Sequence, residues 1–100
     1  MLFGVPFANL NLIVVTMIEA KQCTAARALL GWKQTDLSSA ITKQGGKLSV
    51  TAITAFEKGG AIRESNAVKI VAALEQAGII FIAENGGGAG VRLSKPKGDY

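Results

Sequence analysis

The sequence predicts a mainly α-helical domain that ends in a C-terminal β-hairpin. Three observations support this prediction. Apolar residues recur at helical spacing between residues 19 and 77, and glycines divide this region into four segments. After residue 78 the pattern changes to short β-branched runs on either side of a glycine-rich loop. The chain has 100 residues, of which 49% are hydrophobic, which suits a single core.

Composition narrows the function classes. Eleven Lys and Arg against seven Asp and Glu give a net charge of +4, which favours a polyanionic partner such as nucleic acid. Histidine is absent and there is one cysteine, which argues against histidine-dependent catalysis, the common zinc sites and an intramolecular disulfide. No nucleophile–base pair can be assembled, so we expect neither an enzyme nor a metal or cofactor site, and we expect a reduced, cytoplasmic protein.

Residues 1–16 form an apolar N-terminal extension without a charged side chain. It lacks the basic start of a signal peptide, and Pro6, Asn9 and Asn11 interrupt it too often for a membrane span. Two interpretations remain open. The segment is either an arm, with a strand over Leu12–Thr16, that packs on the domain or on a second subunit, or a superfluous extension before a start at Met17.

The first helix is predicted over Glu19–Leu30, and Gly31 stands at the position that commonly ends a helix. Cys23 falls in its apolar stripe, so we expect a buried structural thiol. Trp32 follows the helix end, where it can cover the open end of the core.

Two short helices follow, with a break at Gly45–Gly46. The first is predicted over Gln34–Thr42, and the second begins after Ser49, a good N-cap, and runs to Lys58. The helical wheel places two large apolar residues of the second helix inward, Ile53 and Phe56. It places small or polar residues outward, namely Thr51, Thr54, Ala55 and Lys58, with Val50 at the margin. This is the outline of a helix-turn-helix, whose second helix enters the major groove of DNA.

The fourth helix is predicted over Asn66–Ala77 with Ser65 as its N-cap, and Gly78 ends it. One broad apolar stripe faces the core. Val68 and Ala72 lie on the other side, which suggests a dimer contact. Residues 17–78 thus form the predicted helix-turn-helix domain.

Residues 79–94 are predicted to form the hairpin, with strands over Ile79–Ala83 and Val91–Ser94. The loop Glu84–Gly90, ENGGGAG, joins two strands and lacks the Gly-Lys-Ser/Thr ending of a phosphate loop, so we interpret it as a turn. A two-stranded hairpin is marginally stable alone, so it needs the helical core or a partner's strand, and it is a candidate dimerisation element. Residues 95–100 read as a tail.

The runs AARALLGWKQTDLSSAI and LSVTAITAFEKG resemble the small bacterial helix-turn-helix regulators of the Cro/repressor type, the XRE family. The run ALEQAGIIFIAENGGGAGVRL is similar to the C-terminal helix and hairpin of a subgroup of these regulators. The resemblance spans about residues 19–93. It implies a four-helix Cro/repressor-like helix-turn-helix domain with a C-terminal β-hairpin.

The resemblance also implies roles for individual residues. Gln34 matches a position that contacts a phosphate or supports the base-reading residues. Glu57 matches a structural position that often pairs with an arginine of the first helix, for which Arg27 is the candidate. The matching base-facing positions are Ser49, Val50, Thr51 and Thr54.

Two features depart from the family pattern. The link around Thr42–Lys47 is longer than the usual tight turn. The base-facing positions carry hydroxyls and methyls in place of Arg, Gln or Asn, which favours thymine methyls and DNA shape over bidentate base contacts. Cations at helix ends and loops are therefore the predicted phosphate contacts besides Gln34, namely Lys33, Lys43, Lys47, Lys58 and Arg63.

From these patterns we predict a sequence-specific DNA-binding transcriptional regulator, with repression as the expected sign. A single domain makes few phosphate contacts, so we expect a homodimer on two half-sites of double-stranded DNA. The alternative is a protein-interaction module or antitoxin-type protein that uses the helix-turn-helix mainly as a scaffold and binds a partner such as a toxin.

Overall fold

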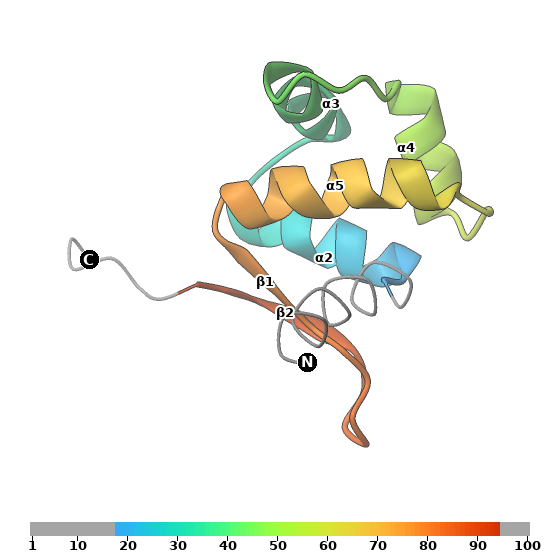
Figure 1. The fold of residues 1–100 in the computed structure, drawn as a ribbon. Helices are drawn as coiled ribbons and strands as arrows, with labels where there is room; N and C mark the ends of the chain where they lie inside the picture. The colour runs from blue at the N-terminus through green and yellow to red at the C-terminus, as the bar shows by residue number, and fades with distance from the viewer. Residues whose placement is uncertain (1–17, 95–100) are drawn as a thin grey trace, which may run out of the picture.

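The computed structural model describes residues 18–94, which form four helices followed by a two-stranded antiparallel hairpin (Figure 1). The prediction of a mainly helical domain with a C-terminal hairpin is confirmed for these residues. The expected N-terminal strand over 12–16 and the tail over 95–100 lie outside the described residues. The elements are α2 (Ala20–Leu30), α3 (Gln34–Lys43), α4 (Val50–Glu57), α5 (Glu64–Gln76), β1 (Ile79–Ile82) and β2 (Gly90–Leu93).

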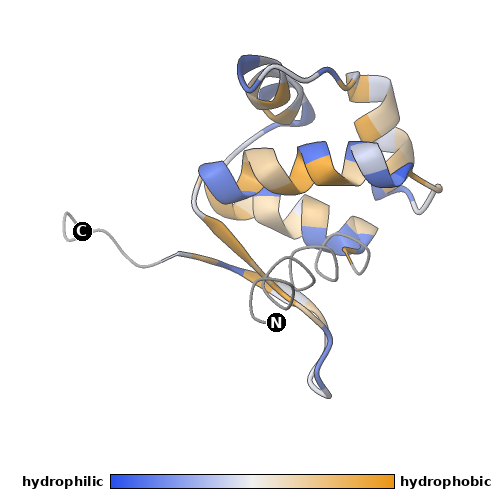
Figure 2. Cartoon of the chain, in the orientation of Figure 1, coloured by the Kyte–Doolittle hydropathy of each residue, from blue (hydrophilic) through white to orange (hydrophobic). Residues whose placement is uncertain are grey.

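Helix α5 is the central element, because it packs against α3, α2 and β1 (Figure 1). Its apolar stripe meets the inward residues of the other helices in one core. The side chains that are fully buried and largest in that core are Leu37, Ile41, Ile53, Ile70, Leu74 and Cys23. Figure 2 shows that β1 is strongly hydrophobic and that the tip of the hairpin is hydrophilic. Ile79 and Phe81 of β1 are buried, whereas Ile80 is exposed.

Helices α2 and α3 begin with capping boxes, which were not predicted from the sequence. The Glu19 amide donates to the side chain of Gln22 at 2.7 Å, and the Lys33 amide donates to Asp36 at 2.7 Å. The lysine side chain has no acceptor with which to cap the free amides of the first turn. The Asp36 carboxylate instead stabilises the helix start by accepting from the Lys33 amide. Gly31 ends α2 with φ 70°, a left-handed conformation that favours glycine, as predicted.

The predicted start of α5 is wrong by two residues. Its N-cap is Arg63, whose carbonyl accepts from the amides of Asn66 and Ala67 at 3.0 Å each, so Ser65 lies inside the first turn. Glu64 occupies that first turn, where a carboxylate suits the positive end of the helix dipole. The Arg63 carbonyl and the Glu64 carboxylate therefore stabilise the start of the helix, and no serine side chain caps it.

The hairpin pairs Ile79 with Leu93 and Phe81 with Val91. Its strands differ from the predicted ranges by one residue: β1 ends at Ile82, and β2 spans Gly90–Leu93. The inward residues Ile79 and Phe81 are buried against the helices, since β1 packs on α5 and β2 on α2. The helical core therefore covers one face of the hairpin.

Within residues 18–94, no helix combines the length and the apolar character that crossing a bilayer requires.

Candidate nucleic-acid interface

The link between α3 and α4 is long, but hydrogen bonds and a buried side chain hold it in place. The Gly46 amide donates to the carbonyl of Ile41 at 3.0 Å, which turns the chain back at the end of α3. The Ser38 hydroxyl donates to the carbonyl of Leu48 at 2.7 Å, and the Leu48 side chain is buried in the core. The start of α4 is thus tied to the body of α3.

Helix α4 begins and packs as predicted. The Ser49 hydroxyl accepts a hydrogen bond from the amide of Ala52 at 3.1 Å, which makes Ser49 the N-cap. Ile53 and Phe56 are buried, and they anchor the inward face of the helix. The opposite face is therefore the one that α4 presents to solvent.

That solvent face is uncharged along most of the helix. Thr51 and Ala55 are exposed, and Val50 is half-buried at the margin. The Thr54 hydroxyl is not free, because it donates to Oε1 of Gln34 at 2.7 Å. Among the predicted base-facing residues, Thr51 makes no side-chain hydrogen bond within the described part of the chain.

A partly buried cluster of polar side chains fixes the far end of α4, and we call it the Glu57 cluster: Cys23, Arg27, Gln34, Thr54 and Glu57. The Arg27 guanidinium donates to both carboxylate oxygens of Glu57, at 2.6 and 2.8 Å, and forms the ion pair predicted from the family resemblance. The Gln34 amide donates to the same carboxylate at 2.9 Å, and the Cys23 thiol does so at 3.0 Å. The cluster joins α2, α3 and α4 at one carboxylate.

The charges of the cluster are stable at neutral pH. Burial acts to raise the pKa of Glu57, but hydrogen bonds from Arg27, Cys23 and Gln34 outweigh it and lower the pKa to about 2. Burial, together with the neighbouring Glu57 carboxylate, raises the pKa of Cys23, so the residue stays a neutral thiol. This agrees with the prediction of a buried structural cysteine and gives the thiol a second role, as a hydrogen-bond donor.

Gln34 acts in this structure as a support for α4. Both ends of its amide are engaged, because Oε1 accepts from Thr54 and Nε2 donates to Glu57. The Gln34 side chain therefore holds α4, the helix that carries the predicted base-facing residues.

The predicted phosphate-contacting cations are all exposed and lie at the ends of helices or in the link between α3 and α4. Lys33 is the N-cap of α3, Lys58 follows α4 and Arg63 is the N-cap of α5. Lys47 lies in the link before α4. Lys43 differs, since it lines a groove between α3 and α5.

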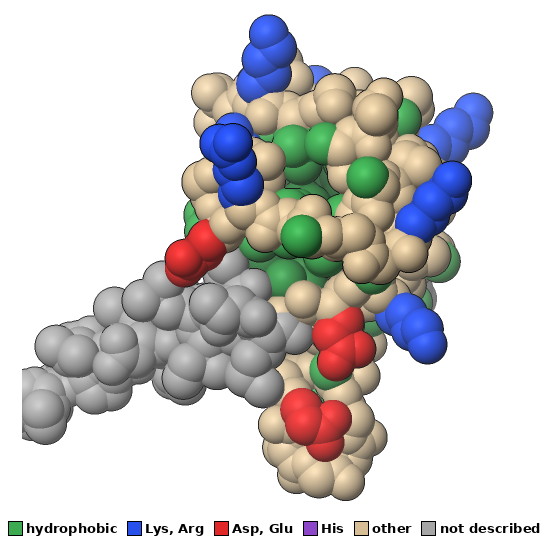
Figure 3. All heavy atoms as spheres, turned by 90° about the vertical axis from the view of Figure 1, so that its right-hand side faces the viewer, with side chains coloured by type: hydrophobic (Ala, Val, Ile, Leu, Met, Phe, Trp, Pro, Cys, Tyr) green, Lys and Arg blue, Asp and Glu red, His purple; other side chains and the backbone are tan. Residues whose placement is uncertain are grey.

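Charge is distributed unevenly on the side of the molecule where α4 lies (Figure 3). Lys and Arg side chains stand around the edge of an uncharged central region; one acidic side chain lies among them at the left edge, and the other acidic side chains visible on this side lie lower, toward the hairpin. An uncharged surface with a cationic rim suits a double helix, because the rim can meet the phosphates that border the groove.

The glycine-rich loop at the hairpin tip uses its own carboxylate to hold its amides. Glu84 accepts from the amides of Gly86 at 3.0 Å and Gly88 at 3.1 Å, and Asn85 accepts from Gly87 at 3.3 Å. These amides are the groups that a phosphate would need, and an internal anion already occupies two of them. The interpretation of this loop as a turn is confirmed.

The described region holds neither a cluster of metal ligands nor an exposed thiol. Over residues 18–94, no three Cys, Asp or Glu side chains come together in an arrangement that could hold a metal ion. Cys23 is completely buried and protonated, so it is not placed to act as a nucleophile.

Two contacts of the Glu57 cluster could not be found from the sequence. The Cys23–Glu57 and Gln34–Thr54 hydrogen bonds join residues 34 and 20 positions apart. Helical periodicity assigned Cys23 to the core and Thr54 to the outward face, and it carries no information about such pairing.

Comparisons of the chain with protein-family models, with curated proteins and with solved structures find no match.

Proposed function

We propose that the protein is a sequence-specific DNA-binding transcriptional regulator of the Cro/repressor-like helix-turn-helix type, which acts as a homodimer in the cytoplasm and represses its target. The observation that supports this most is the surface of α4. The helix presents an uncharged face of small and polar side chains, with Lys and Arg around it (Figure 3). Helix α3 and the Glu57 cluster hold the helix from behind.

The proposed reading surface is narrower than the sequence predicts. Thr51 and Ala55 are the exposed positions within α4, with Val50 beside them, and Ser49 is exposed at the N-cap, while Thr54 is committed to Gln34. Methyl groups on these residues suit contact with thymine methyls, and a face without Arg or Asn lacks bidentate base contacts. Base discrimination then rests on a few apolar contacts and on DNA shape.

Affinity must come largely from phosphate contacts. With Lys33, Lys47, Lys58 and Arg63 engaged, the slope of log K against log[salt] should lie between about −3 and −4 per protomer. Two protomers double the number of contacts, which is the physical reason for a homodimer on two half-sites about one helical turn apart.

The test is a comparison of two threonine variants on selected DNA. A fragment is first enriched from a random pool with the wild-type protein, and its binding is then measured by fluorescence anisotropy over a salt series. Thr51→Glu places a carboxylate on the reading face, so binding should weaken by at least about tenfold, a cost of about 1.4 kcal/mol or more.

Thr24→Glu is the matched control. Thr24 is exposed on α2, outside α3 and α4, so the same substitution should leave affinity within about twofold of wild type. Thermal unfolding of both variants checks that the fold is intact. Failure of the random pool to yield a binder at low salt, or equal loss of affinity in both variants, would refute the proposal.

A second candidate is a protein-interaction module of the antitoxin type, which keeps the helix-turn-helix as a scaffold. It is favoured by large apolar side chains that are exposed away from α4, namely Leu29, Val68, Ile80 and Leu93. Copurification of a stoichiometric partner from the native host, lost in Ile80→Arg and retained in Thr51→Glu, would support this candidate over DNA reading.

A further inference from the structure

Two helices hold the link between α3 and α4, which spans residues 44–49. From α3, the Ser38 hydroxyl donates to the carbonyl of Leu48. From α5, the ammonium of Lys69 donates to the carbonyl of Lys47 at 3.1 Å. The same ammonium donates to Oδ1 of Asn66, one turn earlier in α5, at 3.3 Å. Within residues 18–94, Lys69 is the residue of α5 that forms a hydrogen bond to this link.

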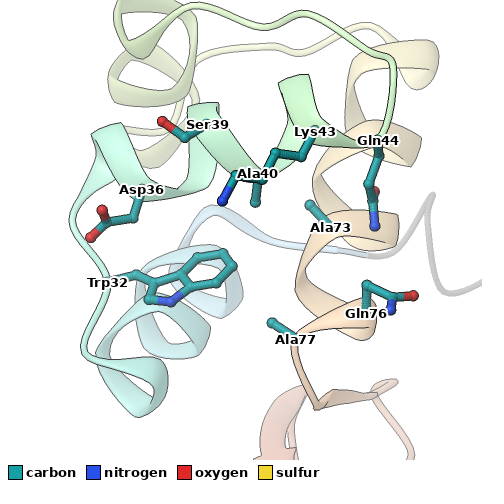
Figure 4. A pocket seen from close by; sticks show the side chains of 9 residues that line it. All are labelled: Trp32, Asp36, Ser39, Ala40, Lys43, Gln44, Ala73, Gln76 and Ala77. Carbon is teal, nitrogen blue, oxygen red and sulfur yellow. The ribbon is translucent and has the colours of Figure 1, made fainter.

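The Lys69 side chain reaches the link by passing Gly46. A Cβ atom at position 46 would lie 3.6 Å from Cδ of Lys69 and 3.0 Å from Cγ2 of Ile41, so a larger residue there would crowd Ile41. The link begins close to α5, because Gln44 lines a groove together with Ala73 of that helix (Figure 4). The glycine therefore lets the link lie between α3 and the aliphatic part of Lys69.

The bond from Lys69 is made just before the start of α4. Lys47 is followed by Leu48, whose side chain is buried, and by Ser49, the N-cap of the helix. A shift of the Lys47 carbonyl is passed through these two residues to the first turn of α4, which carries Thr51. Lys69 is thus tied to the end of α4 from which the proposed reading surface begins.

The two lysines at this point have different surroundings. Lys47 is exposed, and its ammonium makes no hydrogen bond within the part of the chain that the structure describes. Lys69 is half-buried, and its ammonium uses two of its three donors on groups of the protein. Lys47 is therefore placed to reach a phosphate, and Lys69 is placed to hold the chain.

We propose that Lys69 is a positioning residue for the reading surface of α4. It acts through the carbonyl of Lys47 and sets the first turn of the helix without touching DNA itself. The inference rests on the proposed DNA-binding function. A small backbone shift displaces the short side chain of Thr51 from a base edge, whereas the long side chain of Lys47 still reaches its phosphate. Lys69 therefore supports sequence-specific binding more than non-specific binding.

Hydrogen exchange tests the position of α4 without DNA. The amides of Ala52 and Ile53 report on the first turn, because they donate to the hydroxyl and the carbonyl of Ser49 at 3.1 Å each. Lys69→Met removes the donor and keeps an unbranched side chain. These two amides should then exchange at least about fivefold faster, while amides of α2 keep their wild-type rates. Lys69→Arg keeps a donor and should restore slow exchange.

The exchange result has two outcomes that overturn the proposal. Unchanged rates at Ala52 and Ile53 in Lys69→Met would show that the bond does not hold the start of α4. Equal acceleration in α2 and α4 would show a general loss of stability in place of positioning. The melting temperature of the variant is measured alongside, and it should lie within about 3 °C of wild type, because the bond is at the surface.

DNA binding is then compared on two fragments, one selected with the wild-type protein and one of random sequence. Lys69→Met should bind the selected fragment at least about fivefold more weakly and the random fragment within about twofold of wild type. Lys47→Met removes a proposed phosphate contact, so it should weaken both fragments by the same factor. Lys21→Met removes the same charge from an exposed position on α2 and should stay within about twofold on both.

The pattern of losses decides the role of Lys69. Equal weakening of the two fragments by Lys69→Met would mean a direct phosphate contact and would overturn the proposal, as would wild-type binding of the selected fragment. Failure of the random pool to yield any binder would refute the regulator function instead. The exchange experiment contains no DNA, so it still decides whether Lys69 holds the start of α4.

Discussion

Polar side chains of α2 take part both in the Glu57 cluster and in the attachment of the β-hairpin, but the two attachments join different kinds of element: three helices in the cluster, and one helix with two strands in the hairpin. In the cluster, the Glu57 carboxylate of α4 accepts hydrogen bonds from residues of α2 and α3. In the hairpin, Gln22 is the side chain that reaches both strands, through the carbonyls of Ile82 and Gly90.

This difference should appear as a difference in cooperativity. Breaking the cluster removes contacts among three helices that share one core, so the whole domain should lose stability. Breaking the hairpin anchor affects an element that packs at one edge, so the strands should open locally while the helices stay folded. The following variants test this contrast, from the largest expected effect to the smallest.

The largest effect is expected for Glu57→Ala. The Glu57 side chain is 7% exposed and that of Arg27 is 15% exposed, so the variant leaves a nearly buried guanidinium without its partner. It also leaves the Gln34 amide and the Cys23 thiol without their acceptor. Breaking a fully buried pair from one side costs about 3–5 kcal/mol, and because this pair is partly exposed we expect a loss of about 2–3 kcal/mol of unfolding free energy, measurable by urea denaturation.

The control for this prediction removes both charges. The double variant Arg27→Met with Glu57→Leu should be more stable than Glu57→Ala alone, because no unpaired charge stays buried. A cost below about 1 kcal/mol for Glu57→Ala would mean that the cluster does not hold the three helices together.

A smaller loss of stability, also caused by the loss of the Glu57 charge, is expected when the pH is lowered. Glu57 has a folded-state pKa lowered from 4.5 to about 2, so its contribution to stability is present above pH 4.5 and is lost as the pH falls through about 2. Wild-type protein should lose unfolding free energy between about pH 5 and pH 2, in urea series at each pH.

Glu57→Gln isolates this contribution. The unfolding free energy of the variant should depend less steeply on pH than that of the wild type. Subtracting the two curves of unfolding free energy against pH removes the contributions of the other carboxylates. Glu75 is one of them, and burial raises its pKa, so its contribution has the opposite sign and is lost as the pH rises. Parallel curves for the wild type and Glu57→Gln would show that the carboxylate is not protected in the folded state.

The same two regions show what the sequence could predict and what it could not. Local signals placed both helices of the helix-turn-helix, because Ser49 is a good cap and because Ile53 and Phe56 share a face. Glycines also allowed the helix ends and the hairpin loop to be predicted. A left-handed backbone conformation, as at Gly31, depends on the residue itself and not on distant contacts. The pairing of Arg27 with Glu57 came from the family resemblance, and the structure confirms it.

Sequence reasoning failed at one local helix start and where side chains far apart in the sequence meet. Ser65 looked like the best cap near α5, but Arg63 caps the helix, with Glu64 in its first turn. Thr54 looked free to read bases, because nothing near it in sequence takes its hydroxyl, and Gln34 does so from 20 residues away. The groove on α3 and α5 likewise depends on small residues that meet only in the folded chain.

The smallest effect is expected for Gln22→Leu, which tests the other side of the contrast. Gln22 is 5% exposed, and its Nε2 donates to the carbonyls of Ile82 at 3.3 Å and Gly90 at 3.0 Å. Leucine keeps the bulk but loses both bonds and the cap at Glu19, a cost of about 1–2 kcal/mol.

Hydrogen exchange should locate that loss in the hairpin. In Gln22→Leu, amides of β1 and β2 should exchange faster relative to wild type than amides of α4 do, because opening the strands does not require unfolding the helices. Gln44→Leu, at an exposed glutamine without a side-chain hydrogen bond in the described region, should stay within about 0.5 kcal/mol of wild type. Equal acceleration in the hairpin and in α4 would mean that both regions unfold as one unit, because the hairpin would then be as integral to the core as the carboxylate of Glu57.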